Sequence, residues 1–348
     1  MKVLVAPLNW GLGHASRCVP LVHRFLEEGH EVILGGDGES LTLLRKHFPK
    51  LRYVYLAPLN LRYSKSHNQV WAMLRAIPRL IVWSIKDHAL LKAVLREEHI
   101  DQIVSDNRFG LYTPYTIHHT PETVYMTHQL HIMLPKGWRW LEPLAARLHA
   151  RIYTRYNKVW VPDFEDPEKS LAGELSHPHL PFTIYNLQFI GPLSRFSLTA
   201  KRSNSEAVFQ HSGLTAEGGH YDVVAVLSGL EPQRTKLEKE IIDRYTSPSL
   251  QGGEGVGSVL IVQGLMHRPN TRITRGNITI VPHMNDEQLA ACLSSTKHII
   301  ARSGYSTIMD LQALGVLKNA ELVPTPGQPE QEYLAQRVKK KHFFDKKS

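Results

Sequence analysis

Residues 2–14 read KVLVAPLNWGLGH, an apolar run followed directly by a turn that is rich in glycine. The run Lys2–Pro7 contains β-branched valines and lacks the alternation of a half-exposed strand, so it predicts a fully buried strand. Residues 9–13 predict a tight turn, and apolar side chains at helical spacing then continue to Glu28. A buried strand, a turn and a helix in this order are typical of the first unit of a parallel sheet.

The same alternation of strands and helices recurs along the whole chain. Further strands of the first half are predicted at residues 30–34, 51–56, 102–105, 123–126, 157–161 and 186–190. A helical stretch at 70–98 is predicted to break near Pro78. After a polar stretch rich in serine, glycine and threonine, strands are predicted again at residues 221–228, 258–262, 277–281, 297–301 and 319–323. The sequence therefore predicts an α/β fold of two Rossmann-like, doubly wound parallel-sheet domains, at 1–195 and 221–348, with a linker at 196–220.

The composition indicates a folded protein in a reducing compartment. Of 348 residues, 42% are hydrophobic and 21% are charged, which is ordinary for a globular chain. Cys18 and Cys292 cannot build a disulfide framework and lack zinc-site spacing, which predicts a cytoplasmic location. The first residues lack the features of a signal peptide, and no run is long and apolar enough to predict a membrane-spanning helix.

The formal net charge of +9 is concentrated near the end of the chain. Residues 337–348 contain six lysines and arginines and only one acidic side chain, Asp345. This segment accounts for more than half of the excess positive charge. A solvated, frayed terminus explains such a tail as well as a binding function does. The chain has no zinc-finger spacing and no RNP-like aromatic motif, so we expect no nucleic-acid partner.

The first loop that could carry chemistry holds Gly11, Gly13 and His14, between the first strand and the first helix. Glycines there allow a tight turn and the close approach of a ligand to helix-terminal N–H groups. The dinucleotide fingerprint is not complete, because position 16 is a serine, and a plain strand-to-helix turn explains the glycines equally well. His14 is the more informative residue, because a helix start favours a neutral imidazole ring that can accept a proton.

Two loops of the second half repeat this geometry. Ser228 and Gly229 follow a strand and could offer backbone N–H groups to a phosphate, with Arg234 adding charge, although a helix N-cap explains the same residues. The richer loop is residues 301–307, which follows a strand and opens a helix, with Glu330 and Gln331 after the next strand. An anion cradle with acidic and amide side chains nearby suits a nucleotide-sugar. Taken singly, each of these residues is also explained by a structural role, either as a helix cap or as an ordinary polar residue of the surface.

The chain resembles the glycosyltransferase superfamily with the GT-B fold at the following motifs: Gly11 to His14 with Pro20, Arg302-Ser303-Gly304, Thr307, Asp310 and Glu330-Gln331. Within that superfamily it is most similar to the branch of the peptidoglycan N-acetylglucosaminyltransferase that glycosylates lipid I. The resemblance implies that the N-terminal domain binds an acceptor and that the C-terminal domain binds a nucleotide-sugar, usually UDP-linked. Catalysis is then expected in the cleft between them.

Carried over to this sequence, the resemblance assigns roles to individual positions. It makes His14 the acceptor-side residue and a candidate base, and Thr127, His128 and Gln129 resemble the acceptor-side loop more loosely. The donor-side residues implied by it are Arg302, Ser303, Gly304 and Thr307 near the diphosphate, Asp310 on the ribose, and Glu330 and Gln331 near the sugar.

These observations predict an inverting, metal-independent glycosyltransferase that transfers a hexosyl or N-acetylhexosaminyl group to an acceptor hydroxyl. The base would be His14, or Asp106, which ends a predicted strand and otherwise caps the next helix. No cofactor or metal is expected, because no DxD-like pair lies in a suitable loop and helix starts with Arg302 could stabilise the leaving diphosphate. The alternatives are a nucleotide-sugar epimerase or hydrolase of the same fold, and a non-catalytic protein that binds sugar nucleotides.

The stretch 136–155 bears on the acceptor. It interleaves Trp138 and Trp140 and several leucines with five lysines and arginines, a pattern that fits an anionic membrane surface. A core-packed helix with a solvated basic face explains it equally well. The expected partners are therefore a nucleotide-sugar, a glycan or lipid-linked acceptor and, under the first reading, the inner face of a membrane.

Overall fold

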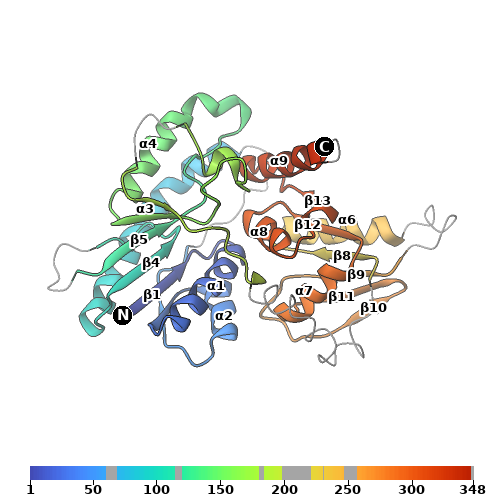
Figure 1. Cartoon of the computed structure of the whole chain (residues 1–348), viewed down its shortest axis with the longest axis horizontal. Helices are drawn as coiled ribbons and strands as arrows, with labels where there is room; N and C mark the ends of the chain where they lie inside the picture. Colours follow the sequence, from blue (N-terminus) through green and yellow to red (C-terminus); the bar gives the residue numbers. More distant parts are fainter. Residues whose placement is uncertain are drawn as a thin grey trace.

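The computed structural model describes residues 1–59, 69–113, 120–179, 184–197, 221–229, 231–246 and 257–345, with side chains omitted at 69–76 and 342–345. It shows two α/β halves side by side, each built on its own sheet (Figure 1). The two parallel sheets confirm the predicted fold class. Most of the predicted linker lies outside the described residues, so the domain boundaries stay a prediction.

The N-terminal sheet is entirely parallel and has the order β3-β2-β1-β4-β5-β6-β7. Its strands are β1 (Lys2–Pro7), β2 (Glu31–Gly36), β3 (Tyr53–Tyr55), β4 (Gln102–Asp106), β5 (Glu122–Met126), β6 (Lys158–Val161) and β7 (Leu187–Phe189). Along β1, Val3 and Val5 pack into one core while Leu4 and Ala6 pack into another. Because successive strand side chains point to opposite faces, the continuous apolar run reflects a sheet that is covered on both sides.

The C-terminal sheet has the order β10-β11-β9-β8-β12-β13. Its strands are β8 (Val223–Val226), β9 (Val259–Val262), β10 (Ile273–Arg275), β11 (Ile278–Val281), β12 (His298–Arg302) and β13 (Ala320–Val323). All pairs are parallel except β10 with β11, which form an antiparallel hairpin at the edge. The sequence did not predict β10, because its three residues are all exposed and show no apolar pattern.

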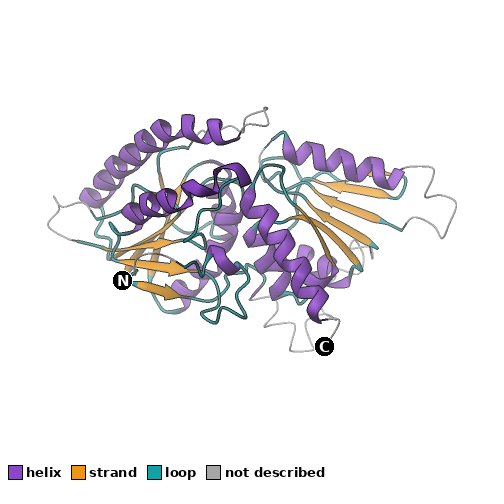
Figure 2. Ribbon diagram, turned by 90° about the horizontal axis from the view of Figure 1, so that it is seen from above, coloured by secondary structure: helices purple, strands orange, loops and turns teal. Residues whose placement is uncertain are grey.

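Helices cover both faces of the two sheets (Figure 2). They are α1 (Gly13–Glu27), α2 (Gly38–His47), α3 (Gln69–Glu97), α4 (Glu142–Tyr153), α6 (Gln233–Thr246), α7 (Asp286–Ser295), α8 (Tyr305–Ala313) and α9 (Pro329–Asp345). The predicted break near Pro78 is wrong, because α3 continues through it. Trp83, Asp87 and Leu91 are buried one turn apart, and this packing offsets the hydrogen bond that the proline removes.

The end of the chain holds the two halves together. α9 lies beside the segment that follows β6 (Figure 1), where Arg337 Nη2 and Lys341 Nζ both donate to the Ser170 carbonyl at 2.9 Å. Leu171 and Leu175 of that segment pack into the same core as residues of α8 and α9. Residues 171–175 therefore belong to the N-terminal half in sequence and to the core of the C-terminal half in space.

Stability should depend on pH through His149, which is buried in α4. Its Nε2 lies 3.1 Å from the Tyr125 hydroxyl, Nδ1 has no partner among the described residues, and burial lowers its pKa to about 4. Below pH 6.5, His149 therefore binds a proton in the unfolded chain but stays neutral in the folded chain until about pH 4. The free energy of unfolding falls as the pH drops from 6.5 to 4. We expect a loss of about 3 kcal/mol over this window. Urea unfolding of the protein and of His149→Leu checks this, and an equally steep pH dependence in the variant would contradict it.

Candidate functional site

The loops singled out by the sequence lie at equivalent places of the two sheets. In the N-terminal sheet the strand order reverses between β1 and β4, and the loop of Gly11 and Asp106 follow these two strands. In the C-terminal sheet the order reverses between β8 and β12, which are followed by Ser228 and Ser303. Ligands of doubly wound sheets bind outside the carboxyl ends of strands at such reversals, because the loops diverge there.

His14 and Asp106 are in direct contact. His14 stands in the first turn of α1, and its Nδ1 lies 3.0 Å from Asp106 Oδ1. The imidazole is partly exposed while the carboxylate is fully buried. No helix follows Asp106 in the described residues up to 113, so the helix-capping role considered for it is wrong.

Arg17, one turn further along α1, neutralises the buried carboxylate. Its Nε donates to Asp106 Oδ2 at 2.6 Å and its Nη2 to Oδ1. Burial acts to raise the pKa of the Asp106 carboxyl, but Arg17 and His14 outweigh it and hold that pKa well below its usual range. Asp106 is therefore an anion at neutral pH, and a charge-assisted fork fixes its orientation.

His128 connects Arg17 of the N-terminal half to Glu330 of the C-terminal half. Its Nδ1 accepts from Arg17 Nη1 at 3.0 Å, and its Nε2 lies 2.7 Å from Oε1 of Glu330 on α9. The ring also stacks on Tyr305 of α8, with centroids 4.2 Å apart. Burial and the charge of Arg17 lower the pKa of His128, although Glu330 acts to raise it. The structure thus joins one predicted acceptor-side residue to one predicted donor-side residue.

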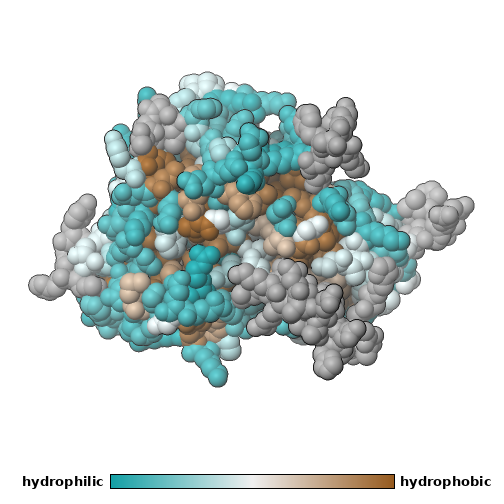
Figure 3. Space-filling view, in the orientation of Figure 1, coloured by the Kyte–Doolittle hydropathy of each residue, from teal (hydrophilic) through white to brown (hydrophobic). Residues whose placement is uncertain are grey.

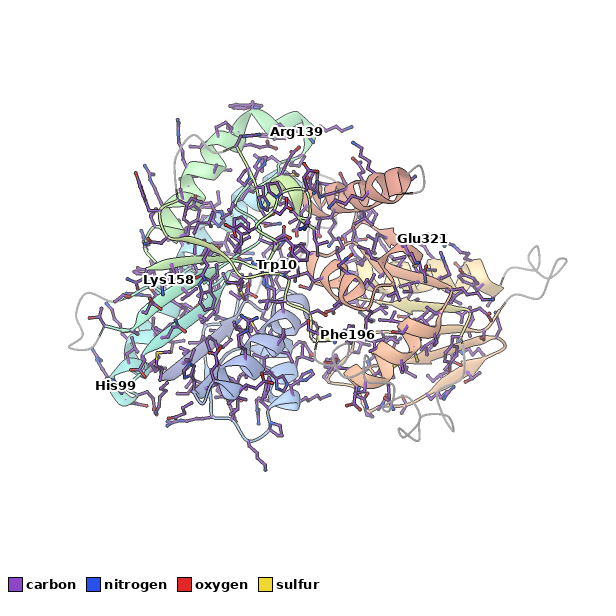
Figure 4. All side chains as sticks on the ribbon, in the orientation of Figure 1. Trp10, His99, Arg139, Lys158, Phe196 and Glu321 are labelled. Carbon is purple, nitrogen blue, oxygen red and sulfur yellow. The ribbon has the colours of Figure 1, made fainter. Side chains whose placement is uncertain are left out.

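The glycine loops also meet at this junction. Gly11 and Gly229 both have positive φ angles, and a Cβ on Gly11 would lie 4.0 Å from Gly229 Cα. Ser306 Oγ donates to the Gly13 carbonyl at 2.8 Å, and a Cβ on Gly13 would come within 2.9 Å of that oxygen. Gly13 is therefore required by the close approach of α8. Figure 4 places Trp10, from the same loop, near the middle of the molecule between the two halves.

On the donor side, the loop before α8 is tied to the start of α9. Gly304 is the N-cap of α8, and Thr307 lies in its first turn. Ser303 Oγ donates to the Gln331 carbonyl at 2.8 Å, while the Gln331 side chain accepts from the Thr325 N–H at 2.8 Å. The first N–H groups of an α-helix have no partner within the helix, so the start of α8 beside this loop has the kind of donors that an anion site needs.

Three predicted donor residues have protein partners that differ from the expected ligand contacts. Arg302 is buried and donates to the carbonyls of Pro324 and Gln233, so it braces two loops. Arg234 pairs with Glu231 and Glu238 and lines a cavity of about 360 Å³ beside α6. The geometry therefore does not favour diphosphate contacts by these two guanidinium groups, because each is already held by protein oxygens.

Asp310 is the third of these residues, and it faces the segment after β7. Ser194 Oγ donates to its Oδ1 at 2.7 Å and Arg195 Nε to its Oδ2 at 3.2 Å. Burial raises the pKa of its carboxyl, although Arg195 acts to lower it. A ribose would have to compete with these two partners, which makes Asp310 a residue that also joins the halves.

Arg108 holds the acceptor-side loops in place, and no sequence motif predicts this role. This fully buried guanidinium donates to the Pro7 carbonyl at the end of β1, to Asp37 after β2, to the Ala57 carbonyl after β3 and to Asp87 of α3. It follows β4 itself, so it ties together the carboxyl ends of four neighbouring strands. Thr127 and Gln129 follow β5 and are joined to each other, because Thr127 Oγ1 accepts from the Gln129 N–H at 3.1 Å.

The part of the chain that the structure describes holds no group of three or more His, Cys, Asp or Glu side chains that could bind a metal ion. In the same residues no helix is long and apolar enough to cross a membrane. The metal-independent reaction stays a prediction.

No protein-family model matches the chain. Over 330 residues it is 24% identical to an uncharacterized glycosyltransferase of Methanosarcina acetivorans, an alignment that covers 91% of this chain and 78% of that protein. Among solved structures, UDP-GlcNAc 2-epimerase from Neisseria meningitidis bound to UDP-GlcNAc gives a TM-score of 0.55 at 12% identity, covering 99% of this chain and 93% of that one. Spinosyn forosaminyltransferase SpnP gives 0.50 at 14% identity, covering 99% and 95%. The fold is that of GT-B glycosyltransferases.

Proposed function

We propose that this protein is an inverting glycosyltransferase that uses a nucleotide-diphosphate sugar, with His14 as the base. The observation that carries the proposal is the contact of His14 with the buried anion Asp106 at the point where the two halves meet. Similarity to a protein described as a glycosyltransferase supports the reaction class, and the likeness to a UDP-sugar enzyme supports a UDP-linked donor.

In the proposed reaction, Nδ1–H of His14 donates to Asp106, which leaves Nε2 with a free electron pair. Nε2 takes the proton of an acceptor hydroxyl while its oxygen bonds to the anomeric carbon and the bond from that carbon to the diphosphate breaks. The charge that develops on the leaving diphosphate faces the start of α8. Asp106 is a poor candidate for the base, because Arg17 occupies both of its oxygens and its pKa is held low.

A thermal-shift screen tests the donor half of the proposal. Nucleoside diphosphates and their sugars bind only the folded protein, so the matching ligand raises the melting temperature by mass action. We expect uridine diphosphate to give a clear shift. No shift with any nucleotide or nucleotide-sugar at millimolar concentration would contradict the proposal.

Asp310 provides a sharper test of the donor site. If its carboxylate binds ribose, Asp310→Asn should weaken uridine diphosphate binding by ~1–3 kcal/mol, the cost of unpaired polar groups. The matched control is Ser194→Ala, which removes a protein partner of Asp310 but keeps the carboxylate. Isothermal titration decides it: an equal loss in both variants, or none in Asp310→Asn, would leave Asp310 as a residue that only joins the halves.

The alternative function is an epimerase or hydrolase, favoured by one observation. The neighbour with the TM-score of 0.55 is a UDP-GlcNAc 2-epimerase. Such an enzyme needs no acceptor hydroxyl at His14. Product analysis separates the two, because an epimerase changes the donor sugar in the absence of any acceptor.

The acceptor is proposed to be a lipid-linked or cell-envelope glycan at an anionic membrane surface. Ile77, Ile81 and Ile85 of α3 stand one turn apart and are exposed, as are Leu144 and Leu148 of α4. Figures 1 and 2 show α3 and α4 side by side on the outside of the N-terminal half, and Figure 3 shows a patch of apolar surface beside α4 on the near face. Packing into the core of the protein therefore accounts for only some of the apolar side chains of α4.

Basic residues flank these apolar side chains. Arg79 and Lys86 lie on α3, Arg147 and Arg151 lie on α4, and Trp140, 73% exposed, precedes α4. Figure 4 shows Arg139 at the outer edge of the same region. Exposed apolar side chains with lysines and arginines on the same helices fit the interface of an anionic bilayer.

We expect the protein to co-sediment with anionic vesicles more than with neutral ones, and less as salt rises, because salt screens surface charges. Replacing Trp140 and Leu144 by serine should abolish pelleting. The control is Tyr185→Ser, which removes an even more exposed aromatic side chain outside this surface. Equal, negligible pelleting of the unmodified protein with both lipids would point to an acceptor in solution.

A further inference from the structure

Two side chains compete for one ring nitrogen of His14. Nδ1 lies 3.0 Å from Asp106 Oδ1 and 2.9 Å from Arg17 Nη2. A carboxylate only accepts hydrogen bonds and a guanidinium only donates them. Nδ1 must therefore carry a proton to bond Asp106 and must lack one to bond Arg17. In the neutral ring, the two contacts therefore belong to two different tautomers.

The two tautomers differ in their chemistry. When Nδ1–H donates to Asp106, the free electron pair is on Nε2, which can then accept a proton from a hydroxyl. When Nδ1 accepts from Arg17, the proton is on Nε2 and the ring is not a base at that atom. The position of Arg17 thus decides whether His14 can perform the proposed step.

The position of Arg17 is held by Asp106 and also, through His128, from the other half of the molecule. Because Arg17 Nη1 can only donate, His128 Nδ1 must accept, and the His128 proton is on Nε2. Nε2–H then donates to Glu330 Oε1 at 2.7 Å. Stacking on Tyr305 holds the ring in this orientation. Glu330 therefore stabilises the one tautomer of His128 that anchors the guanidinium.

We propose that Arg17 is a positioning residue through which Glu330 controls the tautomer of His14. The proposal rests on the proposed function in that Glu330 is expected to contact the donor sugar. A sugar hydroxyl bound to Glu330 would compete with His128 for the carboxylate. His128 could then carry its proton on Nδ1, which repels the Arg17 N–H group. The guanidinium withdraws from His14, Nδ1–H of His14 donates to Asp106, and Nε2 becomes the base.

Nuclear magnetic resonance of the protein labelled with ¹⁵N-histidine reads the tautomers directly, through the two-bond couplings of each ring. A His14→Gln spectrum identifies the signals of His14. We expect Glu330→Ala and Arg17→Lys to raise the ratio of Nδ1–H to Nε2–H in His14 by roughly two- to tenfold, as the loss of one hydrogen bond predicts. The matched control is Glu330→Gln, whose amide oxygen still accepts from His128 and should leave the ratio unchanged.

An unchanged His14 ratio in folded Glu330→Ala and Arg17→Lys would overturn the proposal, and so would an equal rise in Glu330→Gln. Glu330 is partly exposed on α9, so its replacement is expected to leave the fold intact even if Arg17→Lys does not fold. Saturating UDP-N-acetylglucosamine should raise the ratio as Glu330→Ala does. The spectra of the variants are recorded without a donor and do not depend on turnover. They therefore test the effect of Glu330 on the tautomer of His14 separately from the glycosyltransferase function.

Discussion

Replacing His14 with alanine should lower turnover by ~10²–10⁴-fold, which is the usual contribution of a general base. Nucleotide affinity should stay within about twofold, because the proposed donor site belongs to the other half and the lost interaction forms only in the transition state. Turnover, uridine diphosphate affinity and melting temperature measured on one preparation check this.

The control for this variant is His23→Ala in the same helix. His23 packs its ring against Phe48, well along α1 from the junction, so its loss should affect stability and leave turnover nearly unchanged. A folded His14→Ala protein with full turnover would end the role of His14 as the base.

Replacing Asp106 with leucine should cost ~3–5 kcal/mol of folding free energy, because it leaves the buried Arg17 cation without its counter-charge. Turnover should fall as well, since His14 loses the carboxylate that orients it. Urea unfolding measures the first effect, and an acceptor-dependent assay measures the second.

The double variant Arg17→Met with Asp106→Leu separates stability from chemistry. Replacing a buried ion pair by apolar side chains of similar size often restores stability, so the double variant should regain at least half of the loss and remain inactive. Additive losses of stability from the two replacements would contradict the buried pairing of Arg17 with Asp106.

The sheets were predictable because their strands are short apolar runs that end at glycine or polar turns. β1 has its predicted bounds, and β4 was predicted one residue short of Asp106, so the sequence located the loops that follow these two strands. β10 was missed because an exposed edge hairpin leaves no apolar pattern.

Long-range pairing of charges could not be predicted. Arg17 looks like any cation of an amphipathic helix, yet its carboxylate partner is 89 residues away. The His128–Glu330 contact joins residues 202 apart, and Asp310 meets Ser194 and Arg195 only because the halves pack together. The one local signal was that Arg17 lies three residues after His14, on the same face of α1.

The most direct test of the central claim is the anomeric configuration of the product formed from a UDP-sugar and an acceptor, followed by nuclear magnetic resonance as uridine diphosphate is released. The account predicts acceptor-dependent release, a product of inverted configuration, and loss of both in His14→Ala while nucleotide binding is kept. Release at the same rate without an acceptor, or a product of retained configuration, would contradict it.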